Sequence, residues 1–212
     1  MQRIDHPDPA MANAQAREDL ENGATGLALV FAGAPAAHGF GLVADNAEAL
    51  ECTLTGVMPD LIPLRIETAP FAGRPIATLI GSVIEKRRLD PATLAFDFGL
   101  DPVGDMARTG HSPLAWTDLS TRAGGTAKQL AAQGFNTARF LRADGRAVHE
   151  AAGSEAQELA FVLACGVAYL RLLETNGFAL DDARRRITFI LAADADEFMT
   201  IAKFRAIRRL WA

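Results

Sequence analysis

Segments with the pattern of a buried β-strand alternate with helical segments along the whole chain. The strand-like runs cover residues 2–5, 25–31, 61–68, 93–98, 136–142 and 186–191. A helical segment separates each run from the next, so the strands cannot be joined as tight hairpins. Strands connected in this way are expected to be parallel, with right-handed crossovers.

Start and stop signals delimit the intervening helices. We expect helices over residues 11–22, 45–56, 73–88, 114–133, 154–176 and 194–211. Asp8, Asp45 and Asp194 occupy positions typical of N-caps, and Ser154 has the capping-box spacing with Gln157. These signals place a polar residue at the start of several helices, directly after the strands.

Two α/β architectures fit six parallel strand-helix units: an open doubly wound sheet, or part of an eight-unit barrel. A doubly wound sheet usually carries a phosphate-binding loop after its first strand, but the chain has no GxxxxGK[ST] motif. A complete (β/α)8 barrel takes about 250 residues, whereas this chain has 212. We therefore predict an α/β fold, an incomplete TIM-type (β/α)8 barrel of about six units that forms a single domain over residues 1–212.

Composition narrows the class of partner. The net charge is -5 with both signs mixed, which favours neither nucleic acid nor an anionic membrane. The longest apolar run, residues 159–170, is too short to span a bilayer, and the first residues lack a signal peptide. Cys52 and Cys165 have no CxxC context and are expected to be buried free thiols. A soluble, cytoplasmic protein is predicted.

Polar side chains follow most of the predicted strands, where barrel enzymes place their chemistry. They are Asp5, His6, His38, Glu67, Asp97, Asp144, His149, Glu150 and Asp194. Helix N-caps fall at the same end of each unit, and no HxH or HExxH spacing organises the histidines. Spacing alone therefore assigns no catalytic residue, cofactor ligand or metal ligand. A self-sufficient enzyme that uses these Asp and His residues for metal or acid-base chemistry remains the alternative function.

Three segments have a more specific pattern. Residues 20–27, 149–160 and 201–212 resemble, in order and spacing, the barrel domain of methylmalonyl-CoA mutases. The resemblance implies a barrel that threads the CoA tail of its substrate down the axis. It also implies a separate domain that lays adenosylcobalamin over the barrel mouth, and a radical interconversion of methylmalonyl-CoA and succinyl-CoA.

The chain departs from the catalytic members at the positions that steer the radicals. Those members follow the fifth strand with a Tyr-His pair, where this chain has Arg146 and Ala147, and a tyrosine of their first strand falls on Arg3. Similar replacements occur in the small, non-catalytic subunit of heterodimeric mutases. Arg186 aligns with an arginine that contacts CoA, which makes it the one candidate substrate-binding residue. A structural salt bridge at the barrel rim would explain Arg186 equally well.

The resemblance therefore implies a fragment of a small mutase subunit that is not active alone. A cobalamin-binding domain with its DxHxxG signature is missing, so we expect no cofactor to be bound by this chain itself, although the family uses adenosylcobalamin. The expected partner is a catalytic mutase subunit, or a second copy recruited through the open strand edges of a partial barrel. Binding of acyl-CoA through Arg186 without turnover is a third reading.

Overall fold

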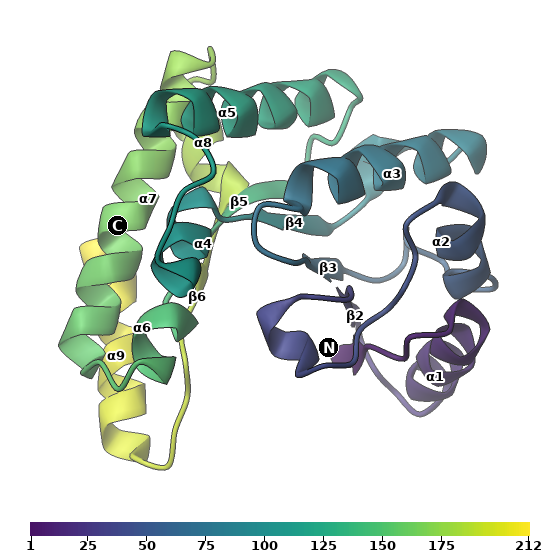
Figure 1. Ribbon diagram of the computed structural model, residues 1–212, viewed down its shortest axis with the longest axis horizontal. Coiled ribbons are helices and arrows are strands. Elements are labelled where there is room, and N and C mark those ends of the chain that lie inside the picture. The colour runs from purple at the N-terminus through teal and green to yellow at the C-terminus, as the bar shows by residue number, and fades with distance from the viewer. The chain divides into compact units, whose positions relative to one another are not determined.

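The computed structural model describes residues 1–212, which fold into two compact units (Figure 1). Unit 1 comprises residues 1–100 and 125–140, and unit 2 comprises residues 101–124 and 141–212. Unit 1 contains β1 (Gln2–Ile4), α1 (Pro9–Glu21), β2 (Leu27–Val30), α2 (Ala47–Thr53), β3 (Leu64–Glu67), α3 (Gly73–Lys86) and β4 (Phe96–Leu100). The single-domain organisation stays a prediction.

Unit 2 is largely helical. It contains α4 (Pro102–Thr109), α6 (Arg146–Glu150), α7 (Glu155–Thr175), α8 (Leu180–Ala183), β6 (Ile187–Ile190) and α9 (Glu197–Leu210). Helix α5 (Trp116–Ala132) and strand β5 (Arg139–Asp144) each contribute residues to both units. Short 3-10 turns lie at Pro35–Ala37, Pro91–Thr93 and Arg184–Arg186.

The six strands pair in chain order, β1-β2-β3-β4-β5-β6, and the pairs β1–β2, β2–β3, β3–β4 and β5–β6 are parallel. A doubly wound sheet reverses its strand order at a switch point, so a strictly sequential order excludes that alternative. The strands at the two ends of this order have a neighbour on one side only, and the sheet is not closed. The predicted α/β fold is therefore confirmed, and the arrangement is consistent with an incomplete TIM-type barrel.

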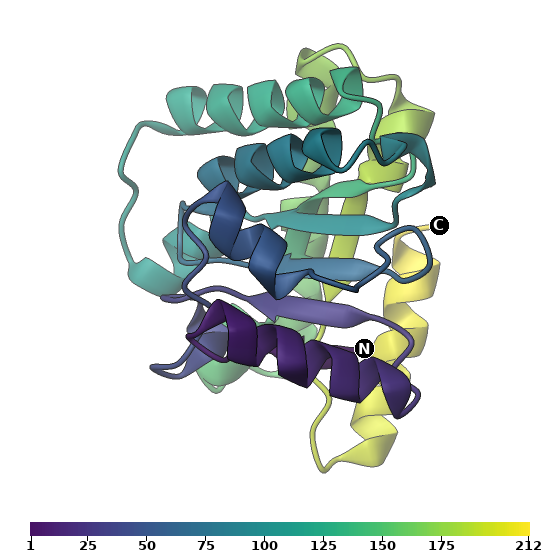
Figure 2. The same ribbon diagram turned by 90° about the vertical axis from the view of Figure 1, so that its right-hand side faces the viewer.

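In unit 1, helices α1, α2 and α3 lie along one side of strands β1 to β4 (Figure 2). An aromatic cluster anchors the core at β4. The rings of Phe96 and Phe98 stack with centroids 5.5 Å apart, and Phe135 meets both edge-on at 6.0 and 5.2 Å. Strand β2 is buried at all four positions, as expected for a continuous apolar run in a parallel sheet.

In unit 2, helix α7 is the central element and contacts α6, α8, α9 and β6. Gly166 lets β6 and α9 approach this helix closely, because a Cβ atom there would lie 2.8 Å from the Phe189 ring and 2.9 Å from Trp211. The Phe189 and Trp211 rings meet edge-on with centroids 4.7 Å apart. The aromatic pair thus packs against the bare backbone of α7.

Helix α7 has nearly the length of the predicted helix over residues 154–176 and extends beyond the apolar run of residues 159–170 at both ends. Its 21 residues are long and apolar enough to cross a membrane, by length and composition alone. The argument from length at the sequence level was therefore wrong. Buried core helices pass the same test, and α7 buries Glu158 and Tyr169, both hydrogen-bonded within unit 2.

Local capping signals were partly confirmed. The Asp8 carboxylate accepts the backbone N–H groups of Ala10 and Met11 at 2.9 Å, with Pro9 at the first helical position. Ser154 and Gln157 form the expected reciprocal capping box at the start of α7. In both cases the sequence places one polar residue directly at the position where the backbone turns into the helix.

Two predicted N-caps, and the predicted burial of one cysteine, were wrong. Asn46 caps α2 in place of Asp45, and Asp196 caps α9 in place of Asp194. In each case a second side chain suited to capping follows within two residues, and it is this second side chain that accepts the helix N–H group. Cys52 is exposed, because α2 buries Leu50, Thr53 and the following Leu54 on its inner face. Cys165 is buried, as predicted.

Candidate functional site at the carboxyl end of β5

Strand β5 ends on Asp144, a carboxylate that is only 4% exposed. Arg146, two residues later in α6, binds it in a fork. The Arg146 Nε donates to both carboxylate oxygens at 3.0 Å, and its Nη2 lies 2.6 Å from Oδ2. The backbone N–H of Arg146 also donates to Oδ1 at 3.0 Å. The strand end and the first turn of α6 are thereby tied together.

A second guanidinium reaches the same carboxylate from α4. The Nη2 of Arg108 lies 3.0 Å from Asp144 Oδ2, and its Nη1 lies 3.0 Å from Glu150. Burial alone would raise the pKa of Asp144, but the hydrogen bonds of Arg146 and the charges of Arg146 and Arg108 outweigh it and lower that pKa. Asp144 is therefore held as a carboxylate. A carboxylate stabilised in this way is a weak base and a poor proton donor.

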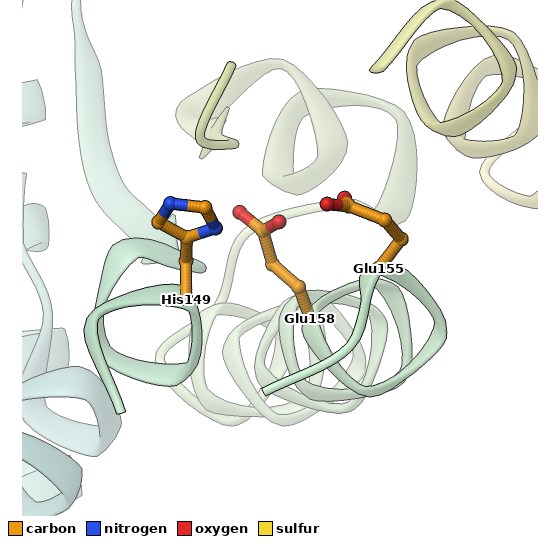
Figure 3. Close-up of side chains that lie close together, drawn as sticks. All are labelled: His149, Glu155 and Glu158. Atoms are coloured by element: carbon orange, nitrogen blue, oxygen red, sulfur yellow. The ribbon is translucent and has the colours of Figure 1, made fainter. Parts of the chain in front are cut away.

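A second polar cluster lies at the start of α7. His149, Glu155 and Glu158 point toward one another (Figure 3), and each offers a ligand atom within 4.8 Å of the others. One imidazole and two carboxylates form a chemically plausible set for a divalent cation. His149 is the one member of the predicted strand-end set found in a group of this kind.

A lysine already supplies the positive charge in this cluster. The Lys203 ammonium, from α9, forms ion pairs with Glu155 and with Glu158, the latter at 2.5 Å. The other oxygen of Glu158 accepts the N–H of Ala192 at 2.7 Å. Burial would lower the pKa of Lys203, but hydrogen bonds to the two glutamates raise it. The geometry is that of an ion-pair lock between α7 and α9, and it does not fit a metal centre.

Arg186 lies far from the carboxyl end of β5. It immediately precedes Ile187, which pairs with Leu141 at the start of the β5–β6 ladder, whereas Asp144 pairs with Ile190 at its end. The buried guanidinium is bound to Asp182, at 2.8 Å from Nη2 and 3.0 Å from Nε. This geometry fits the structural salt bridge that was the alternative explanation of Arg186. Its role in substrate binding stays a prediction.

The strand-end residues of unit 1 pair locally. Asp5 binds Arg3 at 2.6 Å, and Glu67 lies 3.9 Å from Arg65. Asp97 accepts the N–H of Gly99 at 3.1 Å. Two of the histidines lie in turns: His6 accepts the N–H of Asp8 at 3.1 Å, and His38 adopts a left-handed backbone conformation. These interactions do not assemble the residues into a ligand set.

Sequence reasoning missed most of the partners that define these clusters. Glu155 and Glu158 look like the acidic residues that favour a helix start, and Lys203 looks like a basic residue near a helix end. The available signal was Glu158 itself, since it lies on the side of α7 that also carries Val162 and Cys165. A charge at such a position needs a partner, but nothing local identifies Lys203.

Comparison with known proteins identifies the family. The family model described as methylmalonyl-CoA mutase matches residues 1–212. A methylmalonyl-CoA mutase small subunit from Streptomyces virginiae is 38% identical over 100% of this chain and 32% of its own length. A probable small subunit from Mycobacterium bovis is 36% identical over 81% of this chain and 26% of its own length.

The match to another group of relatives is shorter. A methylmalonyl-CoA mutase from Rhizobium meliloti is 38% identical over 41% of this chain and 11% of its own length. The chain spans 32% or less of the length of each of these relatives. The family model and the small-subunit relatives nevertheless cover nearly all of it. The chain therefore belongs to the methylmalonyl-CoA mutase family.

Proposed function

We propose that this chain is barrel-domain sequence of the small, non-catalytic subunit of an adenosylcobalamin-dependent methylmalonyl-CoA mutase, and that it supports a catalytic partner through subunit contact. The relative from Streptomyces virginiae, which matches the full chain, is a small subunit, and this supports the assignment. The observation that carries the non-catalytic role is Arg146. It stands where the resemblance places a radical-steering residue, and its guanidinium is bound to Asp144.

Adenosylcobalamin is the cofactor that we propose for the whole enzyme, where it supplies the radical. The side chains at the carboxyl end of β5 do not fit a radical-steering site. Arg146 and Arg108 are bound to Asp144, and Arg108 is also bound to Glu150. In our proposal this chain contributes a supporting surface, while the partner contributes the reacting groups.

Acyl-CoA binding and location are further parts of the proposal. Arg186 would contribute to CoA binding only if a CoA phosphate or carbonyl competed with Asp182 for the guanidinium. A cytoplasmic location is supported by two cysteines that are both free thiols. Calorimetry with CoA on the wild type and on Arg186→Ala tests the first point, and absent heats in both remove it.

Co-expression with a catalytic mutase subunit tests the proposed role. We expect the tagged chain to retain the untagged catalytic subunit through size-exclusion chromatography. Arg146→Gln in this chain is expected to leave the mutase activity of the complex within twofold of the wild type, because Arg146 serves no reacting atom. A complex that does not form, or an activity loss of tenfold or more with Arg146→Gln while the complex persists, would contradict the proposal.

The metal-dependent or acid-base enzyme is the rival function. The Lys203 ammonium bound to Glu155 and Glu158 argues against it. We expect Zn²⁺ and Mn²⁺ to leave the melting temperature of the wild type unchanged in a thermal-shift assay. A metal-induced rise that His149→Ala abolishes would favour the rival.

A further inference from the structure

A cavity of about 240 Å³ lies between the first half of α5 and the last half of α7, within unit 2. Trp116 and Ser120 line it from α5, and Ala168, Arg171 and Leu172 line it from α7. None of its lining residues belongs to the clusters at the carboxyl end of β5 or at the start of α7. The cavity is therefore separate from the candidate site described above.

The cavity exists because the two helices meet closely at one point and separate from there. Gly124 of α5 lies so close to the end of α7 that a Cβ atom there would collide with the amide of Asn176. One and two turns earlier in α5, Ser120 and Trp116 line the open space between the helices. Leu172 is 5% exposed and Trp116 is 40% exposed. The cavity therefore has a buried apolar wall and an aromatic side chain that solvent reaches.

The hydrogen-bonding groups of the cavity are unevenly used. The hydroxyl groups of Ser120 and Thr121 both donate to the carbonyl of Thr117, at 3.0 and 2.7 Å. The guanidinium of Arg171 and the indole N–H of Trp116, in contrast, form no hydrogen bond or ion pair within the chain. A ligand in the cavity would therefore find unused N–H donors on both helices.

The charge and the size of the cavity limit the kind of ligand. Arg171 is the one charged residue in its lining. A guanidinium without a carboxylate partner can bind a planar carboxylate through two parallel N–H···O bonds. The indole of Trp116 has a face on which a planar ring can stack. Pockets for drug-sized ligands measure about 300–1,000 Å³, so this smaller cavity suits a ligand with a single ring.

We propose that the cavity between α5 and α7 binds a single-ring aromatic carboxylate. The carboxylate pairs with Arg171, and the ring lies between the Trp116 indole and the apolar wall that Ala168 and Leu172 form. The ligand thereby bridges the two helices. This site is independent of the proposed mutase role, because neither a catalytic subunit nor cobalamin takes part in it.

Benzoate is the probe, and the indole N–H signals in nitrogen-15 NMR spectra are the readout. The chain has two tryptophans, and Trp211 packs against Phe189 outside the cavity. We expect benzoate to shift the Trp116 signal saturably and to leave the Trp211 signal in place. Benzamide has the ring without the charge and acetate has the charge without the ring, so each should bind at least about tenfold more weakly. An unmoved Trp116 signal, or an analogue that comes within tenfold of benzoate, would overturn the proposal.

Two variants test the residues that carry the proposal. Arg171→Gln should weaken benzoate binding at least about tenfold, because it removes the charge that pairs with the carboxylate. Its matched control is Arg209→Gln, an exposed arginine of α9, which should bind benzoate within twofold of the wild type.

Ala168→Leu tests the cavity itself, because it fills the space while Arg171 and Trp116 stay in place. It should also weaken benzoate binding at least about tenfold, and leucine is well tolerated in a helix. A smaller loss in either Arg171→Gln or Ala168→Leu, with the variant shown to be folded by its amide spectrum, would show that benzoate does not occupy this cavity.

Discussion

Replacing Lys203 with methionine is expected to lower the free energy of unfolding by about 3–5 kcal/mol, because it leaves a buried carboxylate without its cation. Lys203 is 2% exposed and its partner Glu158 is 1% exposed. Methionine fills a similar volume, so the loss reports the charge and not a cavity. Urea unfolding at pH 7 followed by tryptophan fluorescence measures the effect, since one of the two tryptophans, Trp211, packs against Phe189 beside α7.

The matched control for Lys203→Met is Arg205→Met. Arg205 lies on the exposed side of the same helix, and its replacement should change stability by less than about 0.5 kcal/mol. The double variant Lys203→Met with Glu158→Gln removes both charges. It should be more stable than Lys203→Met alone, because the fully buried carboxylate of Glu158 is gone and only the partly buried Glu155 is left without its lysine. Equal losses for Lys203→Met and Arg205→Met would show that the ion-pair lock contributes nothing.

The order and type of the main elements could be predicted because each one is encoded by neighbouring residues. Six strand-like runs separated by helical segments are sufficient to predict a parallel sheet, and Ser154 with Gln157 identifies the start of α7 to the residue. The caps at Asn46 and Asp196 were missed because another capping acceptor, Asp45 or Asp194, stands one or two residues earlier, and spacing alone does not choose between them. The short helices α6 and α8 were also missed, since four or five residues carry no measurable period.

The candidate site was less predictable because its essential pairs are distant in sequence. The rule that functional residues follow the strands pointed to Asp144. Its partner Arg108 lies on α4, 36 positions earlier in the sequence. Lys203 meets Glu158 across 45 positions, and Tyr169 meets Asp101 across 68. Each of these side chains looks ordinary among its neighbours. Only the folded structure shows which of these side chains form ion pairs or hydrogen bonds with one another.

Asp101 and Asp144 show how position decides the chemistry of two similar acids. Both are buried carboxyl groups that follow or end a strand, and burial alone raises the pKa of each. Asp144 has two arginines beside it, and its pKa falls below the usual value. For Asp101, burial and the negative charges of Asp144 and Asp105 outweigh the hydrogen bonds of Tyr169 and Gly104, and its pKa rises to about 7. The two groups should therefore respond to pH with opposite signs.

Asp144→Asn is expected to destabilise the protein by about 2–4 kcal/mol at pH 7, since it removes the shared charge partner of Arg108 and Arg146. The folded-state pKa of Asp144 lies below 3.8, so its contribution is present above that pH and is lost as the pH falls through the folded-state value. Urea unfolding at pH 7, 5 and 3 should show the gap between wild type and Asp144→Asn narrowing toward acid.

The control for Asp144→Asn is Asp181→Asn, which should show a small and nearly constant difference because Asp181 is 84% exposed. Asp101 does not obscure the acid limb, because it is present in both the wild type and Asp144→Asn, so its own pH dependence is common to the two chains that are compared. A gap for Asp144→Asn that is as wide at pH 3 as at pH 7 would mean that the two arginines do not stabilise an ionised carboxylate. The cluster at the end of β5 would then be held together by packing. The ion pair between Arg146 and Asp144 would no longer explain why residue 146 has a structural role and no catalytic one.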